Sequence, residues 1–300
     1  MGVKGLFKFI ASKTTATTLR SLDEFTGNII AMDASVMIYR WYATGSQFHN
    51  HIQGMLFRTV AIMEAGALPF YVFDGKPSNA KRATIEARAE ARERGGLHVP
   101  EQIFDECRQL LALMGLPIII ADGEADHTIA ALVRTGVAVA AFSDDSDLLT
   151  HGVTTLLRME GSAKTNKVTS ISLENVLNTL ALTHRAFIDF CILLGTDYNA
   201  PIRGIGPAKA LSTIQKYGAI EAAIAAGALQ SSVQSCADIA RAEYSMQIPL
   251  SIERPVMRIL SDDEFVKLRL FLETKMSEPR IKKVMERLLV FRDHLVKTIT

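Results

Sequence analysis

Cysteine is scarce in this chain, and its pattern excludes two classes of small protein. Three cysteines occur in 300 residues, at Cys107, Cys191 and Cys236, and no two of them form a CxxC pair. We therefore expect neither a disulfide framework nor a cysteine-based zinc site. The pattern favours a reducing, intracellular compartment rather than a secreted protein.

Long apolar runs and an excess of one charge are also missing. No run approaches the roughly 20 residues that a membrane-spanning helix needs, so no membrane association is expected. The net charge is only +1, so any binding to a polyanion must depend on locally concentrated basic residues. The N-terminus carries no acid before Asp23, as in a transit peptide, but Val3, Leu6, Phe7 and Ile10 fit one face of a helix. We interpret this segment as a helix docked on the protein.

Short apolar runs predict a parallel sheet that is covered on both faces. They read NIIAMDAS, LPFYVFDG, LPIIIADGEAD, VAVAAFSDDSD and TTLLRM. Helical patterns lie between them, and two of these end at Gly66 and Gly115, which are plausible C-caps. This alternation predicts a doubly wound, mainly parallel α/β fold. We assign residues 1–170 to this α/β domain, including a charged segment at 76–100, and residues 171–300 to a helical region.

Carboxylates follow the predicted strands at the point where each strand ends. They are Asp33, Asp74, Glu124, Asp126, Asp145 and Asp147. Because the carboxyl ends of parallel strands meet at one edge of a sheet, these acids should converge there. Clustered carboxylates repel one another, and a divalent cation such as Mg²⁺ or Mn²⁺ would relieve that cost. The alternative is that each acid caps a helix, which explains a single acid better than it explains the whole set.

The helical region carries a further acid and a glycine turn. Asp197 follows an apolar helical run, and GIGPAKA follows shortly after it. Gly204 and Gly206 would let backbone N–H groups approach a phosphate, with the next helix beginning at Pro207 and Lys209 nearby. Such a turn grips the nucleic-acid backbone without reading bases. An ordinary tight turn between packed helices is the alternative.

The charged segment after Asp74 separates its charges at helical spacing. If it is helical, Lys81, Arg88 and Arg92 share one stripe, and the glutamates lie on the opposite side. A solvated, salt-bridged helix is one interpretation. The segregation of the charges favours a cationic face that is turned toward phosphates.

Together these motifs resemble the flap endonuclease family of structure-specific 5′ nucleases, the xeroderma pigmentosum group G type. GVKGL, MDASVMIYR, YVFDGKPS, GEADHTIAALV, SDDSDLL, FCILLGTDY and IRGIGPAKA stand in the family's order along nearly the whole chain. The resemblance implies a PIN-like nuclease core and a two-metal phosphodiesterase. Its expected cofactor is Mg²⁺, for which Mn²⁺ can substitute, and its expected partner is branched or nicked DNA with a single-strand flap.

The resemblance also implies a role for individual residues. Seven acids match the metal site, namely Asp33, Asp74, Glu124, Asp126, Asp145, Asp147 and Asp197. Lys81 and Arg88 match catalytic residues of the arch, Tyr39 matches an aromatic that stacks on a base, and Gly2 matches an N-terminus near DNA once Met1 is removed. The expected DNA contacts of the glycine turn are Arg203, Gly204, Gly206 and Lys209, with K⁺ bound at the turn, and Arg92 extends the basic stripe. Asp144 is an extra acid, which we interpret as a neighbour or a cap.

Three departures from the family pattern bear on these expectations. Asp126 stands where a glutamate is usual, and the chain between Asp74 and Glu124 is short, so the arch should be reduced. A sliding-clamp-binding tail and a basic nuclear signal are not recognisable, as in a reduced viral or divergent member. We expect a monomer in the nucleus, or in the cytoplasm if the protein is viral. The alternatives are a related exonuclease or junction resolvase, a catalytically silent DNA-junction binder, and, less favoured, an RNA-cleaving domain.

Overall fold

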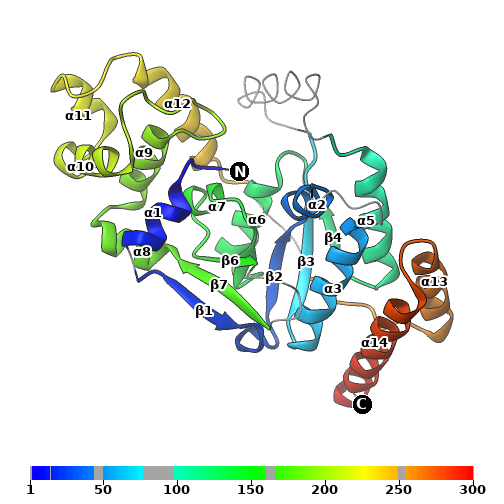
Figure 1. Ribbon diagram of the computed structural model, residues 1–300. Coiled ribbons are helices and arrows are strands. Elements are labelled where there is room, and N and C mark those ends of the chain that lie inside the picture. Colours follow the sequence, from blue (N-terminus) through cyan, green and yellow to red (C-terminus); the bar gives the residue numbers. More distant parts are fainter. Residues whose placement is uncertain are drawn as a thin grey trace.

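The fold centres on a seven-stranded mixed sheet (Figure 1). The computed structural model describes residues 2–13, 15–43, 50–76, 98–159, 166–248 and 254–299. The sheet order is β1-β7-β6-β5-β2-β3-β4. The strands are β1 Thr17–Ser21, β2 Ile29–Asp33, β3 Leu68–Phe73, β4 Ile118–Ile120, β5 Ala140–Phe142, β6 Thr155–Met159 and β7 Lys167–Ser172. Strand β7 pairs antiparallel with both β1 and β6, whereas the other four pairs among the described strands are parallel.

The five predicted strands are all present, and the predicted α/β fold class is confirmed. The sequence patterns missed β1 and β7, which pair with each other at one edge. Strand β1 has no fully buried position, and Leu19 in it is 60% exposed, so it lacks the apolar run of a central strand.

Helices cover both faces of the sheet (Figure 1). They are α1 Leu6–Lys13, α2 Ala34–Tyr42, α3 Asn50–Glu64, α5 Glu101–Leu113, α6 Ala125–Arg134, α7 Asp147–Thr150, α8 Leu173–Leu180, α9 His184–Leu194, α10 Pro207–Tyr217, α11 Ile220–Ala225, α12 Val233–Ser245, α13 Asp262–Glu273 and α14 Glu278–Ile299. Successive strand side chains point to opposite faces. Ile29 and Ala31 join the core that includes α1, α6 and α9, whereas Ile30 and Met32 join the core that includes α2, α3 and α5.

The predicted helix boundaries are also found. Gly66 and Gly115 follow α3 and α5 with φ of 78° and 71°, the left-handed conformation that glycine adopts without a steric penalty. Pro207 begins α10. The N-terminal segment forms α1, which buries Leu6 and Ile10 in the core, as the docked-helix interpretation requires.

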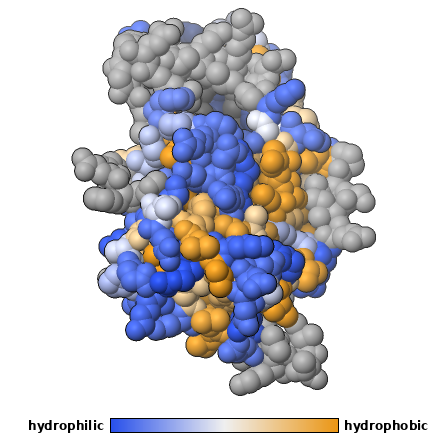
Figure 2. Space-filling view, turned by 90° about the vertical axis from the view of Figure 1, so that its right-hand side faces the viewer, coloured by the Kyte–Doolittle hydropathy of each residue, from blue (hydrophilic) through white to orange (hydrophobic). Residues whose placement is uncertain are grey.

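The later helices lie in two places. Helices α9 to α12 gather at one end of the molecule, while α13 and α14 pack against α5 and α3 at the other (Figure 1). On this second side, apolar residues lie among hydrophilic ones (Figure 2), and α13 and α14 expose Val266, Leu270 and Val290. The division of the chain at residue 170 into two domains stays a prediction.

No described helix is by itself long and apolar enough to cross a bilayer, although α8 and α9, which meet at 83°, pass that test as a bent pair by length and composition. Helix α9 is largely buried in the core: every residue from Phe187 to Leu194 is buried.

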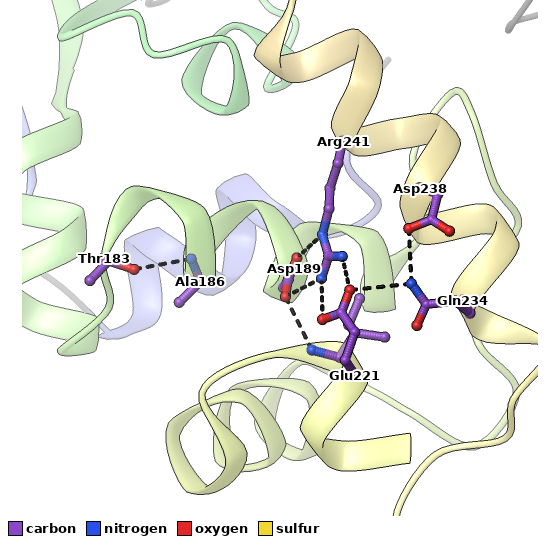
Figure 3. Close-up of polar contacts among 8 residues, drawn as sticks. Thr183, Ala186, Asp189, Glu221, Gln234, Asp238 and Arg241 are labelled. Carbon is purple, nitrogen blue, oxygen red and sulfur yellow. Dashed lines mark hydrogen bonds and ion pairs between the residues drawn. The ribbon is translucent and has the colours of Figure 1, made fainter. Parts of the chain in front are cut away.

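A buried ion-pair network holds α9, α11 and α12 together (Figure 3). Arg241 of α12 donates two hydrogen bonds of 2.6 Å to the carboxylate of Asp189 in α9, which is fully buried. The same guanidinium pairs with Glu221 of α11, and the backbone N–H of Ile220 donates to Asp189 at 3.1 Å. The hydrogen bond from Arg241 holds the pKa of Glu221 down at about 2. Burial alone would lower the pKa of Arg241, but its two acid partners outweigh burial and raise it.

Candidate active site

The predicted acids gather at one edge of the sheet. Asp33 ends β2, Asp74 follows β3, Glu124 lies between β4 and α6, and Asp145 and Asp147 follow β5. Strands β5, β2, β3 and β4 are adjacent and parallel, so their carboxyl ends share this edge. Asp33, Glu124, Asp126, Asp145 and Asp147 are all buried, at 9% exposure or less, whereas Asp74 is exposed.

Ser143 joins two of these acids. Its hydroxyl donates to Asp33 Oδ2 at 2.7 Å and accepts from the backbone N–H of Asp145 at 2.9 Å. Burial, and then the negative charge of Asp74, raise the pKa of Asp33 to about 7. This shift is the electrostatic cost of placing carboxylates side by side in a buried site.

Two acids also serve as helix caps, so the capping alternative is correct in part. Asp33 accepts from the backbone N–H of Val36 at 3.1 Å at the start of α2. Asp74 accepts from the N–H of Ala125 at 2.8 Å at the start of α6. These bonds stabilise a negative charge at the helix N-termini and fix each carboxylate against the sheet edge.

Gly2 lies directly against the SDDSD loop. Its φ is +79°, and a Cβ built on it would collide with Asp145 Oδ1 and would lie 2.7 Å from Asp147 Oδ1. The two carboxylate oxygens therefore converge on the space beside the Gly2 backbone. The N–H of Asp147 donates to Asp145 Oδ1 at 3.0 Å, and this bond holds the two acids in a fixed relation. The sequence placed Gly2 near bound DNA, and the structure places it beside the acids.

Two tyrosines reach the acids from the helical side. Tyr198, next to Asp197, donates from its hydroxyl to Glu124 Oε2 at 3.4 Å. Tyr244, near the end of α12, donates to Asp147 Oδ2 at 2.9 Å. Burial and the charge of Asp147 raise the pKa of Tyr244 well above its usual value, so the phenol keeps its proton. The loop that carries Asp197 thus meets the edge where the other acids lie.

Arginines surround the extra acid, Asp144. Arg40 of α2 and Arg158 of β6 both pair with its carboxylate, so Asp144 is an ion-pair neighbour rather than a cap. Arg58 of α3 is fully buried, and none of its three guanidinium nitrogens donates a hydrogen bond within the described residues. Burial accordingly lowers the pKa of Arg58. The three arginines therefore form a cationic cluster beside the acids that are predicted to bind metal.

The remaining predicted residues divide into three groups. Tyr39 is half-buried on α2, where its ring meets Phe104 edge to face at 5.9 Å. Gly204 has φ of +76°, and Lys209 donates to its carbonyl at 3.5 Å, so a tight turn precedes α10, while its contact with a phosphate stays a prediction. Arg203 is exposed and Gly206 stands at the N-cap of α10. Lys81, Arg88 and Arg92 lie outside the described residues.

The donor set suits a hard divalent cation. It consists of carboxylate oxygens, and the raised pKa of Asp33 and the convergence of Asp145 and Asp147 on the Gly2 backbone mark a site with crowded negative charge. Within residues 2–13, 15–43, 50–76, 98–159, 166–248 and 254–299, no three acid, histidine or cysteine side chains are grouped closely enough to hold a metal as they stand. The chemistry of the residues therefore fits Mg²⁺, although the described side chains do not themselves form a closed coordination shell.

Sequence reasoning missed several residues at this edge. Ser143 lies in SDDSDLL and Tyr198 lies in FCILLGTDY, so their position beside predicted metal-site acids could have identified them. Tyr244, Arg58 and Arg158 carry no such signal, because long-range packing brings them to the site.

Comparisons with known proteins agree on one kind of relative. Family models described as the XPG N-terminal domain and the XPG I-region match residues 1–95 and 115–197. Flap endonuclease 1 of Danio rerio is 37% identical over 257 residues, which cover 74% of this chain and 68% of that protein. Flap endonuclease 1 of Homo sapiens is 36% identical over 257 residues and is covered to the same extent, 74% of this chain and 68% of that protein.

Solved structures show the same fold. The catalytic core of Rad2 in complex with a DNA substrate has a TM-score of 0.76 at 22% identity, over 97% of this chain and all of that one. The flap endonuclease-1 of Methanococcus jannaschii has a TM-score of 0.74 at 20% identity, over 98% of this chain and 99% of that one. Human GEN1 with Holliday-junction DNA has a TM-score of 0.74 at 19% identity, over 99% of this chain and 80% of that one.

Proposed function

Because this chain belongs to the XPG and flap endonuclease family and is a structure-specific 5′ nuclease, we propose that its sheet-edge acids bind Mg²⁺ and cleave DNA near single-strand to double-strand junctions. Members of the family are metal-dependent hydrolases, and the proposed place of action of this enzyme is inside the cell. The observation that carries the proposal is the convergence of acids from four adjacent parallel strands on one edge.

The acids have distinct positions in the proposed site. Asp33, Asp74 and Glu124 line the ends of β2, β3 and β4, while Asp145 and Asp147 adjoin Gly2. With Asp126 and Asp197 they would hold two ions, and Mn²⁺ would substitute for Mg²⁺. When bound, the ions supply charge neutralisation of the phosphate and a lowered pKa for the attacking water.

The chain's own residues prepare this site before any substrate arrives. Ser143 fixes the spacing of Asp33 and Asp145, and the helix N-termini orient Asp33 and Asp74. Asp126 is one methylene shorter than the usual glutamate, so it should alter metal preference rather than abolish binding. Lys81 and Arg88 are proposed to stabilise the negative charge that develops on the scissile phosphate.

DNA contacts are proposed on three surfaces. The turn at Arg203, Gly204, Gly206 and Lys209 would hold the duplex backbone, with K⁺ bound at the turn. Gly2, Tyr39 and Arg92 would meet the strand near the cut. Arg40 and Arg158, which are partly exposed beside Asp144, provide a further site for a backbone phosphate. The proposed substrate is a flap or nick, the proposed assembly is a monomer, and the proposed compartment is the nucleus.

Replacement of single acids tests the proposal. Asp145→Asn and Asp147→Asn should each abolish Mg²⁺-dependent cleavage of a 5′-flap substrate and should spare binding measured in Ca²⁺, which is less exacting in geometry. Asp122→Asn is the matched control, because Asp122 is an exposed acid just before Glu124 that lies outside the set. Near-normal turnover by Asp147→Asn would remove its role. Relative rates on flap, nicked, gapped and four-way substrates would define the preferred junction.

A further inference from the structure

The hydroxyl of Tyr244 links the helical end of the molecule to an acid of the sheet edge. Tyr244 belongs to α12, and its phenol donates to Asp147 Oδ2 at 2.9 Å across 97 positions of sequence. Tyr244 is 4% exposed, so this hydrogen bond is shielded from water. A buried hydrogen bond to a charged group is stronger than one at the surface.

The end of α12 is fixed in place by several contacts. The ring of His151, which follows α7, meets Tyr244 edge to face at 5.1 Å, and His127 of α6 meets His151 at 4.7 Å. The Nε2–H of His127 donates a hydrogen bond of 3.2 Å to the backbone carbonyl of Glu243. The Tyr198 ring packs on Tyr244 at 5.2 Å. Tyr244 therefore has little freedom to leave Asp147.

The hydrogen bond determines which way the carboxylate faces. With Oδ2 held by the phenol, Asp147 Oδ1 lies toward Gly2, beside Asp145 Oδ1. If the plane of the Asp147 carboxylate turned out of this orientation, Oδ1 would move away from Asp145 Oδ1. A ligand that is oriented in advance binds a cation more tightly than one that must first be ordered.

We infer that Tyr244 is a positioning residue that orients Asp147 for divalent-metal binding and so couples the placement of α12 to the metal site. The inference rests on the proposed function, because it takes Asp147 to be a metal ligand. In this role Tyr244 itself contacts neither metal nor substrate.

The test measures metal binding in the absence of DNA. Mn²⁺ is titrated into the full chain and followed by electron paramagnetic resonance, using wild type, Tyr244→Phe and Tyr71→Phe. The phenylalanine keeps the ring contacts and removes only the hydroxyl. Tyr71 is a matched control, because it is fully buried and its hydroxyl bonds Thr59 at 2.8 Å, with no acid involved. Melting curves confirm that each variant is folded at the titration temperature.

Tyr244→Phe should bind Mn²⁺ about tenfold more weakly than wild type, the loss typical of an outer-sphere partner, and Tyr71→Phe should bind like wild type. The Mg²⁺ concentration that half-saturates cleavage should rise in the same variant, with the rate recovering at high Mg²⁺. Unchanged Mn²⁺ affinity in Tyr244→Phe would overturn the inference, as would an equal loss in both variants.

Asp147→Asn separates this inference from the proposed function. If Asp147→Asn loses Mn²⁺ affinity and Tyr244→Phe does not, the metal site stands and the positioning role fails. If Asp147→Asn binds Mn²⁺ as wild type does, the metal role of Asp147 fails, and the role of Tyr244 fails with it.

Discussion

Removal of the Arg241 side chain should destabilise the helical end of the molecule far more than removal of a surface arginine. In Arg241→Ala the carboxylate of Asp189 stays buried with no cation to balance it. The loss of one partner from a buried, hydrogen-bonded ion pair costs about 3–5 kcal/mol. The loss should be in this range, because Asp189 is fully buried and two short hydrogen bonds disappear together.

The control is Arg269→Ala, in which an exposed arginine loses its pairs with Glu273 and Glu278. Exposed pairs contribute little, so this variant should melt close to wild type. Thermal unfolding should place Arg241→Ala roughly 10 °C below wild type. Hydrogen exchange should show the loss of protection in α9, α11 and α12 before it appears in the sheet.

The network should also show in the pH dependence of stability. The pKa of Glu221 is about 2 in the folded chain against an ordinary 4.5. Its stabilisation is therefore fully present above about pH 4.5 and is lost as the pH falls toward 2. Because Glu221 is about half exposed, its share is about 1 kcal/mol, and it should be absent from Arg241→Ala. Equal melting temperatures for Arg241→Ala and Arg269→Ala would refute the whole argument.

Three further outcomes are expected. Gly2→Ala should lose cleavage with little loss of thermal stability, because the added Cβ collides with Asp145 Oδ1; unaltered single-turnover rates would contradict this. Lys81→Ala and Arg88→Ala should each lower the single-turnover rate more than DNA affinity, and a loss confined to affinity would make them plain phosphate contacts. The segment between Asp74 and Glu124 is short, so the enzyme should cleave flaps whose 5′ end was blocked before the enzyme was added. Strong inhibition by the block would mean that the segment still closes over the strand.

The sequence predicted those parts of the fold and site that depend on local pattern. Apolar runs located the central strands, and the acids that follow them lie at one edge, because parallel strands share a direction. The turn at Gly204 and the start of α10 at Pro207 were likewise local. Strand β1 was missed because an edge strand without a fully buried position resembles a loop in sequence. Strand β7 was missed because its buried positions include Thr169 and Ser170, which interrupt the apolar run of a central strand.

Long-range contacts were beyond such patterns. Nothing near Tyr244 in the chain indicates that it bonds Asp147, since that contact depends on where α12 docks. Arg58 illustrates the opposite case, because a charged residue in an amphipathic helix is expected on the surface and here is fully buried. Packing of α2, α3 and β6 around Asp144 could not be foreseen from spacing alone.

Anomalous diffraction from crystals of the full chain grown with Mn²⁺ would show directly whether the sheet-edge acids bind metal. We expect two strong peaks at the sheet edge, within ligand distance of carboxylates that include Asp33, Asp145 and Asp147. Wild-type crystals with Mn²⁺ peaks only elsewhere on the surface, together with retained cleavage in the same metal, would contradict it.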